Sequence, residues 1–137
     1  MAKKVIITGI TGTLGSALGK LYLQRGWDVY GVTRQPLEQH DACSHVITNQ
    51  QAGITDAAAL LEIDADLVYL NAGAIEKEIG SMGEPLSEMT QSITTINYTF
   101  PAVFALEASK RAERPMDIIA IGSIADGSPS AFGPVYH

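Results

Sequence analysis

The sequence is poor in cysteine, in basic residues and in long hydrophobic runs, and each shortage excludes a class of protein. Cys43 is the only cysteine, so no internal disulfide can form, and a reducing, cytoplasmic setting is the simplest interpretation. The formal net charge of −6 argues against nucleic acid as the main partner, because phosphate backbones bind basic surfaces. No apolar run approaches the roughly 20 residues that span a bilayer. The N-terminus also lacks the apolar core of a secretory signal, so we expect no membrane partner.

What the sequence does contain is an alternation of strand and helix patterns in a single domain, residues 1–137. Apolar runs predict strands at residues 4–8, 28–33, 45–48, 65–70 and 117–121. Apolar residues at helical spacing predict helices from about residue 14 to Gly26, from 56 to 62 and from 86 to 111. Strands that are apolar on both faces and separated by helices indicate an α/β fold. We therefore expect a doubly wound parallel sheet of about five strands with helices on both faces.

A glycine-rich turn follows the first predicted strand and opens the first predicted helix. Its sequence, Thr8-Gly9-Ile10-Thr11-Gly12-Thr13-Leu14-Gly15, has a glycine at every third position. Glycine allows a tight turn and a close approach of the backbone to a pyrophosphate, and the free N–H groups of the helix would bind that anion. The cofactor-binding residues predicted here are Gly9, Thr11, Gly12, Thr13, Leu14 and Gly15. A glycine loop without a ligand is the alternative.

The spacing T-G-x-x-G-x-x-G resembles that of the short-chain dehydrogenase/reductase family, and its extended or atypical branches more than its main branch. Asn71-Ala72-Gly73, at the end of the fourth predicted strand, resembles the N-A-G motif of the same family. Leu70 departs from the pattern, since many members have a second Asn there. The resemblance implies a Rossmann-type fold and an NAD(P)(H)-dependent oxidoreductase that transfers hydride to or from a carbonyl or alcohol substrate. It also implies that Asn71, Ala72 and Gly73 lie along the cofactor.

The end of the second predicted strand indicates which cofactor is preferred. NAD sites usually place Asp or Glu there to hold the ribose hydroxyls, but this chain has Thr33 and Arg34. A guanidinium pairs well with a 2′-phosphate. We therefore predict that Thr33 and Arg34 bind the cofactor and that NADP(H) is preferred over NAD(H). Arg34 as a solvated charge at a strand end stays open as the alternative.

The long helix contains a proline, Pro101, in its interior. Proline cannot donate to the carbonyl four residues back, which is that of Asn97. Asn97 also matches the catalytic Asn of the family, whose backbone carbonyl holds a water in a proton relay. We predict that Asn97 is catalytic and that Pro101 frees its carbonyl. The alternative is a proline kink beside an incidental Asn.

Ser123 and Tyr136 complete the resemblance to the family's catalytic residues. They are 13 residues apart and follow the fifth predicted strand. By the resemblance, Tyr136 gives a proton to the substrate oxygen while Ser123 holds that oxygen by a hydrogen bond. The family's Y-x-x-x-K motif would place a lysine at position 140, beyond His137. We therefore interpret the chain as the front part of such an enzyme, with little or no turnover by itself. A non-catalytic dinucleotide-binding module or an inactive fragment is the alternative.

After Asp117, the fifth predicted strand lacks the charged residues and prolines that usually prevent an edge strand from pairing with another chain. Residues 118–121 include neither a charge nor a proline, as in an interior strand that lacks its neighbour. We expect a homo-oligomer on this ground, although the end of the chain could cover the strand instead. The histidines have no metal-ligand spacing with Cys43 or with each other, so we expect no metal site.

Overall fold

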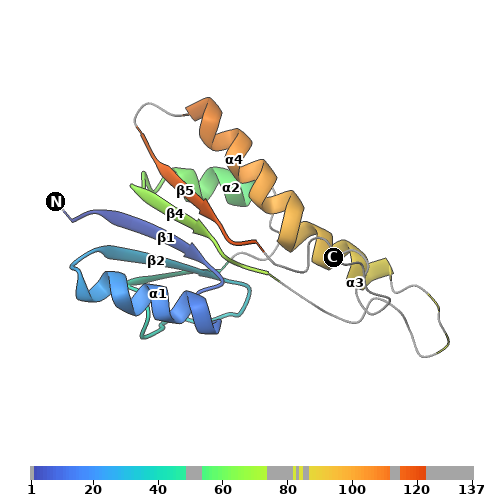
Figure 1. The fold of residues 1–137 in the computed structure, drawn as a ribbon, viewed down its shortest axis with the longest axis horizontal. Coiled ribbons are helices and arrows are strands. Elements are labelled where there is room, and N and C mark those ends of the chain that lie inside the picture. The colour runs from blue at the N-terminus through green and yellow to red at the C-terminus, as the bar shows by residue number, and fades with distance from the viewer. Residues whose placement is uncertain are drawn as a thin grey trace.

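The structure is a computed structural model that describes residues 2–48, 54–73, 82, 84, 87–111 and 115–122. The elements in chain order are β1 (Lys4–Thr8), α1 (Thr13–Gln24), β2 (Asp28–Thr33), β3 (His45–Thr48), α2 (Ile54–Leu61), β4 (Leu67–Leu70), α3 (Ser87–Thr94), the π-helical turn η1 (Thr95–Thr99), α4 (Phe100–Arg111) and β5 (Asp117–Ala120). Figure 1 shows β2, β1, β4 and β5 side by side, with helices packed against them.

The sheet is parallel throughout, with the strand order β3-β2-β1-β4-β5. Its register places Ile6 of β1 between Tyr30 of β2 and Val68 of β4. In chain order, β2 and β3 are added on one side of β1, and β4 and β5 are then added on its other side. The strand order therefore reverses between β1 and β4. Ligands of doubly wound folds bind beside such a reversal, at the carboxyl ends of the strands. The expected fold class, a doubly wound parallel sheet, is confirmed.

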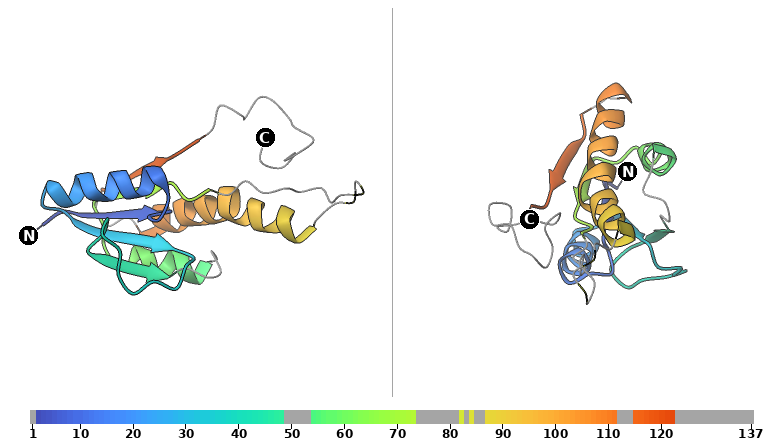
Figure 2. Two further views of the ribbon diagram at one scale, coloured as in Figure 1. Left: turned by 90° about the horizontal axis from the view of Figure 1, so that it is seen from below. Right: turned by 90° about the vertical axis from the view of Figure 1, so that its right-hand side faces the viewer.

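Each face of the sheet has its own hydrophobic core, because successive side chains of a strand point to opposite faces. Val5 and Ile7 of β1 pack with Val29 and Tyr22 on the face that α1 covers. Ile6, between them in β1, packs on the other face, where α2 and α4 contribute residues such as Phe104. Figure 2 shows α1 and the α2–α4 pair on opposite sides of the sheet. Helices therefore cover both faces, as the sequence predicted.

The long predicted helix is interrupted in the structure. It consists of α3, the π-turn η1 and α4, and the Phe100 N–H bonds the Thr95 carbonyl, five residues back. Pro101 is the second residue of α4, directly after this turn and Phe100, and the expected release of the Asn97 carbonyl by Pro101 stays a prediction. None of the helices in the described ranges is both long and apolar enough to cross a membrane.

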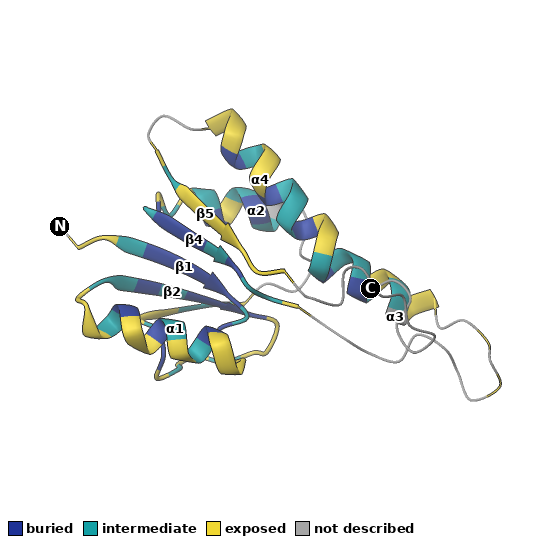
Figure 3. Cartoon of the chain, in the orientation of Figure 1, coloured by how far each residue is buried: buried dark blue, intermediate teal, exposed yellow. Residues whose placement is uncertain are grey.

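Strand β5 lies at the edge of the sheet, with β4 on one side and no described strand on the other. Its apolar side chains are exposed, by 36% at Ile118 and 39% at Ile119, and Figure 3 shows the whole strand as exposed. The strand thus resembles an interior strand in composition and an edge strand in position. Homo-oligomer formation through this edge stays a prediction.

Candidate functional site

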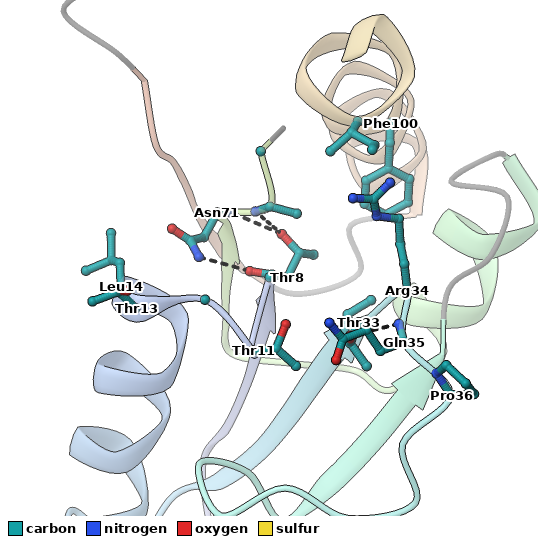
Figure 4. A pocket seen from close by; sticks show the side chains of 16 residues that line it. Thr8, Thr11, Thr13, Leu14, Thr33, Arg34, Gln35, Pro36, Asn71 and Phe100 are labelled. Carbon is teal, nitrogen blue, oxygen red and sulfur yellow. Dashed lines mark hydrogen bonds between the residues drawn. The ribbon is translucent and has the colours of Figure 1, made fainter. Parts of the chain in front are cut away.

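A pocket of about 630 Å³ opens where β1, β2 and β4 end, which is within the usual size of a small-molecule site. Figure 4 shows it between the glycine turn, the end of β2, the segment after β4 and the long helix. The lining residues are Thr8, Gly9, Thr11, Gly12, Thr13, Leu14, Val32, Thr33, Arg34, Gln35, Pro36, Asn71, Ala72, Gly73, Ile96 and Phe100. Every residue that the sequence predicted as cofactor-binding is among them except Gly15.

The glycine turn depends on glycine at both of its ends. Gly9 has a φ of +71°, and a Cβ there would lie 3.0 Å from the Ala72 Cα. A Cβ at Gly15 would overlap the Gly9 carbonyl, so Gly15 lets α1 start directly against the turn although it does not line the pocket. The N–H groups of Gly9 and Ile10 both donate to the Val32 carbonyl, at 3.0 and 3.2 Å, and anchor the turn to β2.

The start of α1 is suited to an anion. Gly12 caps the helix without any side-chain hydrogen bond, and the first turn has no acidic residue. The first N–H groups of a helix have no partner within it, and the positive end of the helix dipole lies there. The Gly12 N–H donates to the Gly9 carbonyl at 3.1 Å, whereas the N–H groups of Thr13 and Leu14 are available to a phosphate at the pocket.

Thr8 fixes the opposite wall of the pocket. Its hydroxyl donates to the Tyr69 carbonyl at 3.3 Å and accepts the N–H groups of Asn71 and Ala72, both at 2.9 Å. The Asn71 amide returns a hydrogen bond to the Thr8 carbonyl at 3.2 Å, as Figure 4 shows. Thr8 is only 2% exposed. The sequence pattern predicts no role for Thr8 beyond its place in the glycine turn; the one signal for this role is a polar residue at the end of an apolar strand.

Arg34 is the one charged residue among the described residues that line the pocket. It follows β2 directly and is exposed, and in Figure 4 its guanidinium extends across the pocket toward Phe100. Thr33, before it, is buried, and its hydroxyl accepts the Gln35 N–H at 3.0 Å. Gln35 and Pro36 also line the pocket and were missed, because loop residues after a strand have no periodic signal.

The helical wall comes from the π-turn η1 and the first residue of α4. Ile96 and Phe100 are buried and line the pocket, whereas the sequence pattern predicts only a helix at these positions. Asn97 lies in the same turn, and its Oδ1 faces Gly73 closely enough that a Cβ at Gly73 would be 3.6 Å away. The structure thus brings the predicted catalytic Asn next to the predicted cofactor-binding segment.

The other two predicted catalytic residues, Ser123 and Tyr136, lie outside the described residues. Their placement relative to Asn97 is therefore not part of the site as described. Within the described residues, no group of three or more His, Cys, Asp or Glu gathers closely enough to hold a metal ion.

The sequence model of the NAD dependent epimerase/dehydratase family matches residues 5–101. The chain belongs to this family. The matched range begins in β1 and ends at Pro101. It therefore contains the glycine turn, Thr33, Arg34, the segment Asn71–Gly73 and Asn97, which are all the described residues of the predicted site.

Individual relatives agree with this assignment. A GDP-mannose 4,6-dehydratase of Sordaria araneosa is 37% identical over 65 residues, which are 44% of this chain and 12% of that protein. A solved short-chain dehydrogenase/reductase of Vibrio parahaemolyticus matches with a TM-score of 0.79 at 24% identity, covering 96% of this chain and 69% of its own. A 3-ketoacyl-(acyl-carrier-protein) reductase of Brucella melitensis, solved with NADH, matches with a TM-score of 0.76 at 19% identity, covering 98% and 62%.

The two solved structures show that the fold is that of the short-chain dehydrogenases/reductases, as the motifs predicted. The chain spans 12% of the length of the curated relative and 62–69% of the length of these two solved proteins.

Proposed function

We propose that the pocket binds NADP(H) in preference to NAD(H), and that the protein is an NAD(P)(H)-dependent oxidoreductase acting on a carbonyl or alcohol substrate. The observation that carries the proposal is the charge of the pocket. In a chain with a net charge of −6, the described lining residues include no carboxylate and one guanidinium, that of Arg34. A carboxylate at the end of β2 would favour NAD(H), whereas a guanidinium favours a 2′-phosphate.

The described residues fit a dinucleotide. The glycine turn and the N-terminus of α1 would hold the pyrophosphate, because glycine at positions 9 and 15 permits the tight turn and the first turn of α1 has no acidic residue that opposes the charge. Arg34 would hold the 2′-phosphate, and Asn71–Gly73 would lie along the cofactor. When bound, the nicotinamide supplies the hydride donor or acceptor.

The catalytic part of the proposal rests on the family resemblance. Tyr136 would move a proton to or from the substrate oxygen, and Ser123 would hold that oxygen by a hydrogen bond. A free phenol has a pKa near ~10, so Tyr136 needs a nearby positive charge to act as a base at neutral pH. Asn97, facing Gly73 across the pocket wall, would belong to the proton path.

The family match favours a second candidate reaction. The matched family is one of epimerases and dehydratases, and one relative is a GDP-mannose 4,6-dehydratase. In such a reaction hydride would be removed from the substrate and returned within one turnover, so no cofactor would be consumed. A pocket that binds the dinucleotide without any turnover, as a binding module, would also use the described residues alone.

A titration of the chain with NADPH beside NADH tests the proposal. We expect saturable binding of both with NADPH bound more tightly. Removing the guanidinium in Arg34→Ala should weaken NADPH binding by about ten- to a hundredfold, because charge-assisted hydrogen bonds are lost, and should leave NADH binding nearly unchanged. Arg25→Ala is the matched control, since it removes the same charge at the far end of α1.

Three outcomes are informative. Binding of neither cofactor would overturn the proposal, and equal affinity for both would overturn the NADP(H) preference alone. With cofactor bound, net NADPH oxidation in the presence of carbonyl substrates favours a reductase. Conversion of a nucleotide sugar without net oxidation favours the epimerase/dehydratase reaction.

A further inference from the structure

The chain turns a tight corner after β2, and Thr33 holds it. Thr33 is the last residue of β2, only 5% exposed, and its Oγ1 accepts the Gln35 N–H at 3.0 Å. A second turn follows at once, because the Leu37 N–H donates to the Gln35 carbonyl at 2.8 Å around Pro36. Threonine hydroxyls commonly form such local turns with the N–H two residues on. Arg34 is thus the residue between Thr33 and Gln35, which this hydrogen bond joins.

The buried hydroxyl has a clear consequence for Arg34. The Thr33–Gln35 hydrogen bond restricts the backbone of the residue between them, so the direction in which the Arg34 side chain leaves the chain is fixed. Arg34 is exposed, and its guanidinium makes no ion pair among the described residues. Holding a ligand-binding side chain in place before binding reduces the entropy lost on binding.

Thr33 also stands where an NAD site usually has its carboxylate. The Thr33 oxygen is turned onto the chain at Gln35 and is buried, so its observed role is to shape the turn. In an NAD site the residue at this position would contact the ribose itself. Here Thr33 instead fixes the backbone from which Arg34 extends into the pocket.

We propose that Thr33 is a positioning residue for cofactor selection, which favours NADP(H) by fixing the backbone that presents Arg34 to the pocket. The proposal rests on the proposed function, in which Arg34 meets the 2′-phosphate. Thr33 acts through Arg34, so its removal should affect the cofactor with the extra phosphate more than the one without it.

The test compares Thr33→Val, Thr33→Ser and Arg34→Ala with the unmodified chain. Valine has nearly the shape of threonine and suits a strand, so β2 should be kept while the acceptor for the Gln35 N–H is lost. We expect Thr33→Val to lower the ratio of NADPH to NADH affinity by about three- to tenfold, with the larger loss for NADPH. Thr33→Ser keeps the hydroxyl and should restore the ratio.

A double variant, Thr33→Val with Arg34→Ala, separates the two roles. If Thr33 acts through Arg34, the double variant should have the affinity ratio of Arg34→Ala alone, because the two changes are not additive. Thermal unfolding of each variant serves as the control for the fold.

Each other outcome counts against the inference. If Thr33→Val weakens NADPH and NADH binding equally, or lowers the melting temperature without changing the ratio, Thr33 is structural and the inference fails while the proposed function stands. The same holds if Arg34→Ala lowers the ratio and Thr33→Val does not. If Arg34→Ala itself keeps the original ratio, the phosphate assignment fails and the role of Thr33 fails with it.

Discussion

Strands β1 and β5 have similar side chains and opposite surroundings. Val5 and Ile7 of β1 are completely buried, whereas Ile118 and Ile119 of β5 are exposed by 36% and 39% (Figure 3). β1 has a strand on each side and helices over both faces, while β5 has one described neighbour. An apolar, β-branched run therefore predicts a strand. Whether its side chains are buried depends on the position of that strand in the sheet. Thr8 is the last residue of the covered strand β1 and the glycine turn follows it directly, so small changes should matter most there.

The largest contrast should appear on α4, which has one side in the covered core and one outside it. Phe104 is fully buried and Leu106 is 62% exposed. Phe104→Ala should lower the free energy of unfolding by about 3–5 kcal/mol, through lost burial and the cavity left behind. Leu106→Ala should change it by less than about 0.5 kcal/mol. Urea unfolding measures both, and comparable losses would mean that a partner or further chain covers Leu106.

The same substitution at two glycines compares the turn with the end of β5. A Cβ at Gly15 would overlap backbone atoms of Gly9, whereas a Cβ at Gly122 would meet none of the described residues within 4 Å. Gly15→Ala should lower the free energy of unfolding by about 2–3 kcal/mol, because backbone has to move to relieve the overlap. It should also abolish measurable NADPH binding, and Gly122→Ala should leave stability and binding unchanged. Calorimetry and a cofactor titration check this, and a harmless Gly15→Ala would contradict the turn geometry.

A smaller effect is expected from the Thr8 hydroxyl. Thr8→Val leaves the N–H groups of Asn71 and Ala72 without their acceptor, which should lower the free energy of unfolding by about 1–3 kcal/mol. Cofactor binding should weaken with it, because the wall formed by residues 71–73 is no longer held. Thr8→Ser keeps the hydroxyl and should retain most of both. Denaturation and titration of the three proteins test this, and equal behaviour of Val and Ser would exclude the hydrogen bonds as the cause.

The smallest expected effect is a dependence of stability on high pH. Burial, and next its 2.8 Å hydrogen bond with the Tyr69 hydroxyl, raise the pKa of Tyr22 from 10.0 to about 12. The folded state then keeps a proton that the unfolded state loses, so the Tyr22 contribution is complete below pH 10 and decreases as the pH rises from 10 toward 12. The melting temperature of Tyr22→Phe should therefore decrease less between pH 10 and pH 12 than that of the unmodified protein. Parallel pH profiles of the two proteins would contradict the shift.

The first three strands of the chain were predictable because their signals are local. β1, β2 and β3 begin and end at the predicted residues, since their apolar runs are bounded by glycine, charged or polar residues. β4 begins at Leu67 and not at Ala65, and α2 extends from Ile54 to Leu61 in place of 56–62. Such ends depend on tertiary contacts, as where Asp66 accepts the Lys4 N–H at 2.8 Å just before β4.

The candidate site was predictable to the extent that it consists of short motifs. The glycine turn, Arg34 and residues 71–73 meet at one pocket because parallel strands all present their carboxyl ends on the same side. Ile96 and Phe100 reach the pocket only because the long helix crosses it, which depends on the packing of α4 against the sheet. Pro101 signalled that the helix was disturbed, but a proline does not specify that the disturbance is a π-turn.

That π-turn makes the length of the long helix a fixed property of the protein. A π-turn contains one residue more than an α-helical turn, and each residue of an α-helix rotates its face by about 100°. Deleting one residue within Thr95–Thr99 would restore a regular helix, yet it would rotate α3 relative to α4 and carry Ile93, now fully buried, out of the core. The number of residues in this segment is therefore constrained by packing on both sides of the turn, at Ile93 in α3 and at Phe104 in α4.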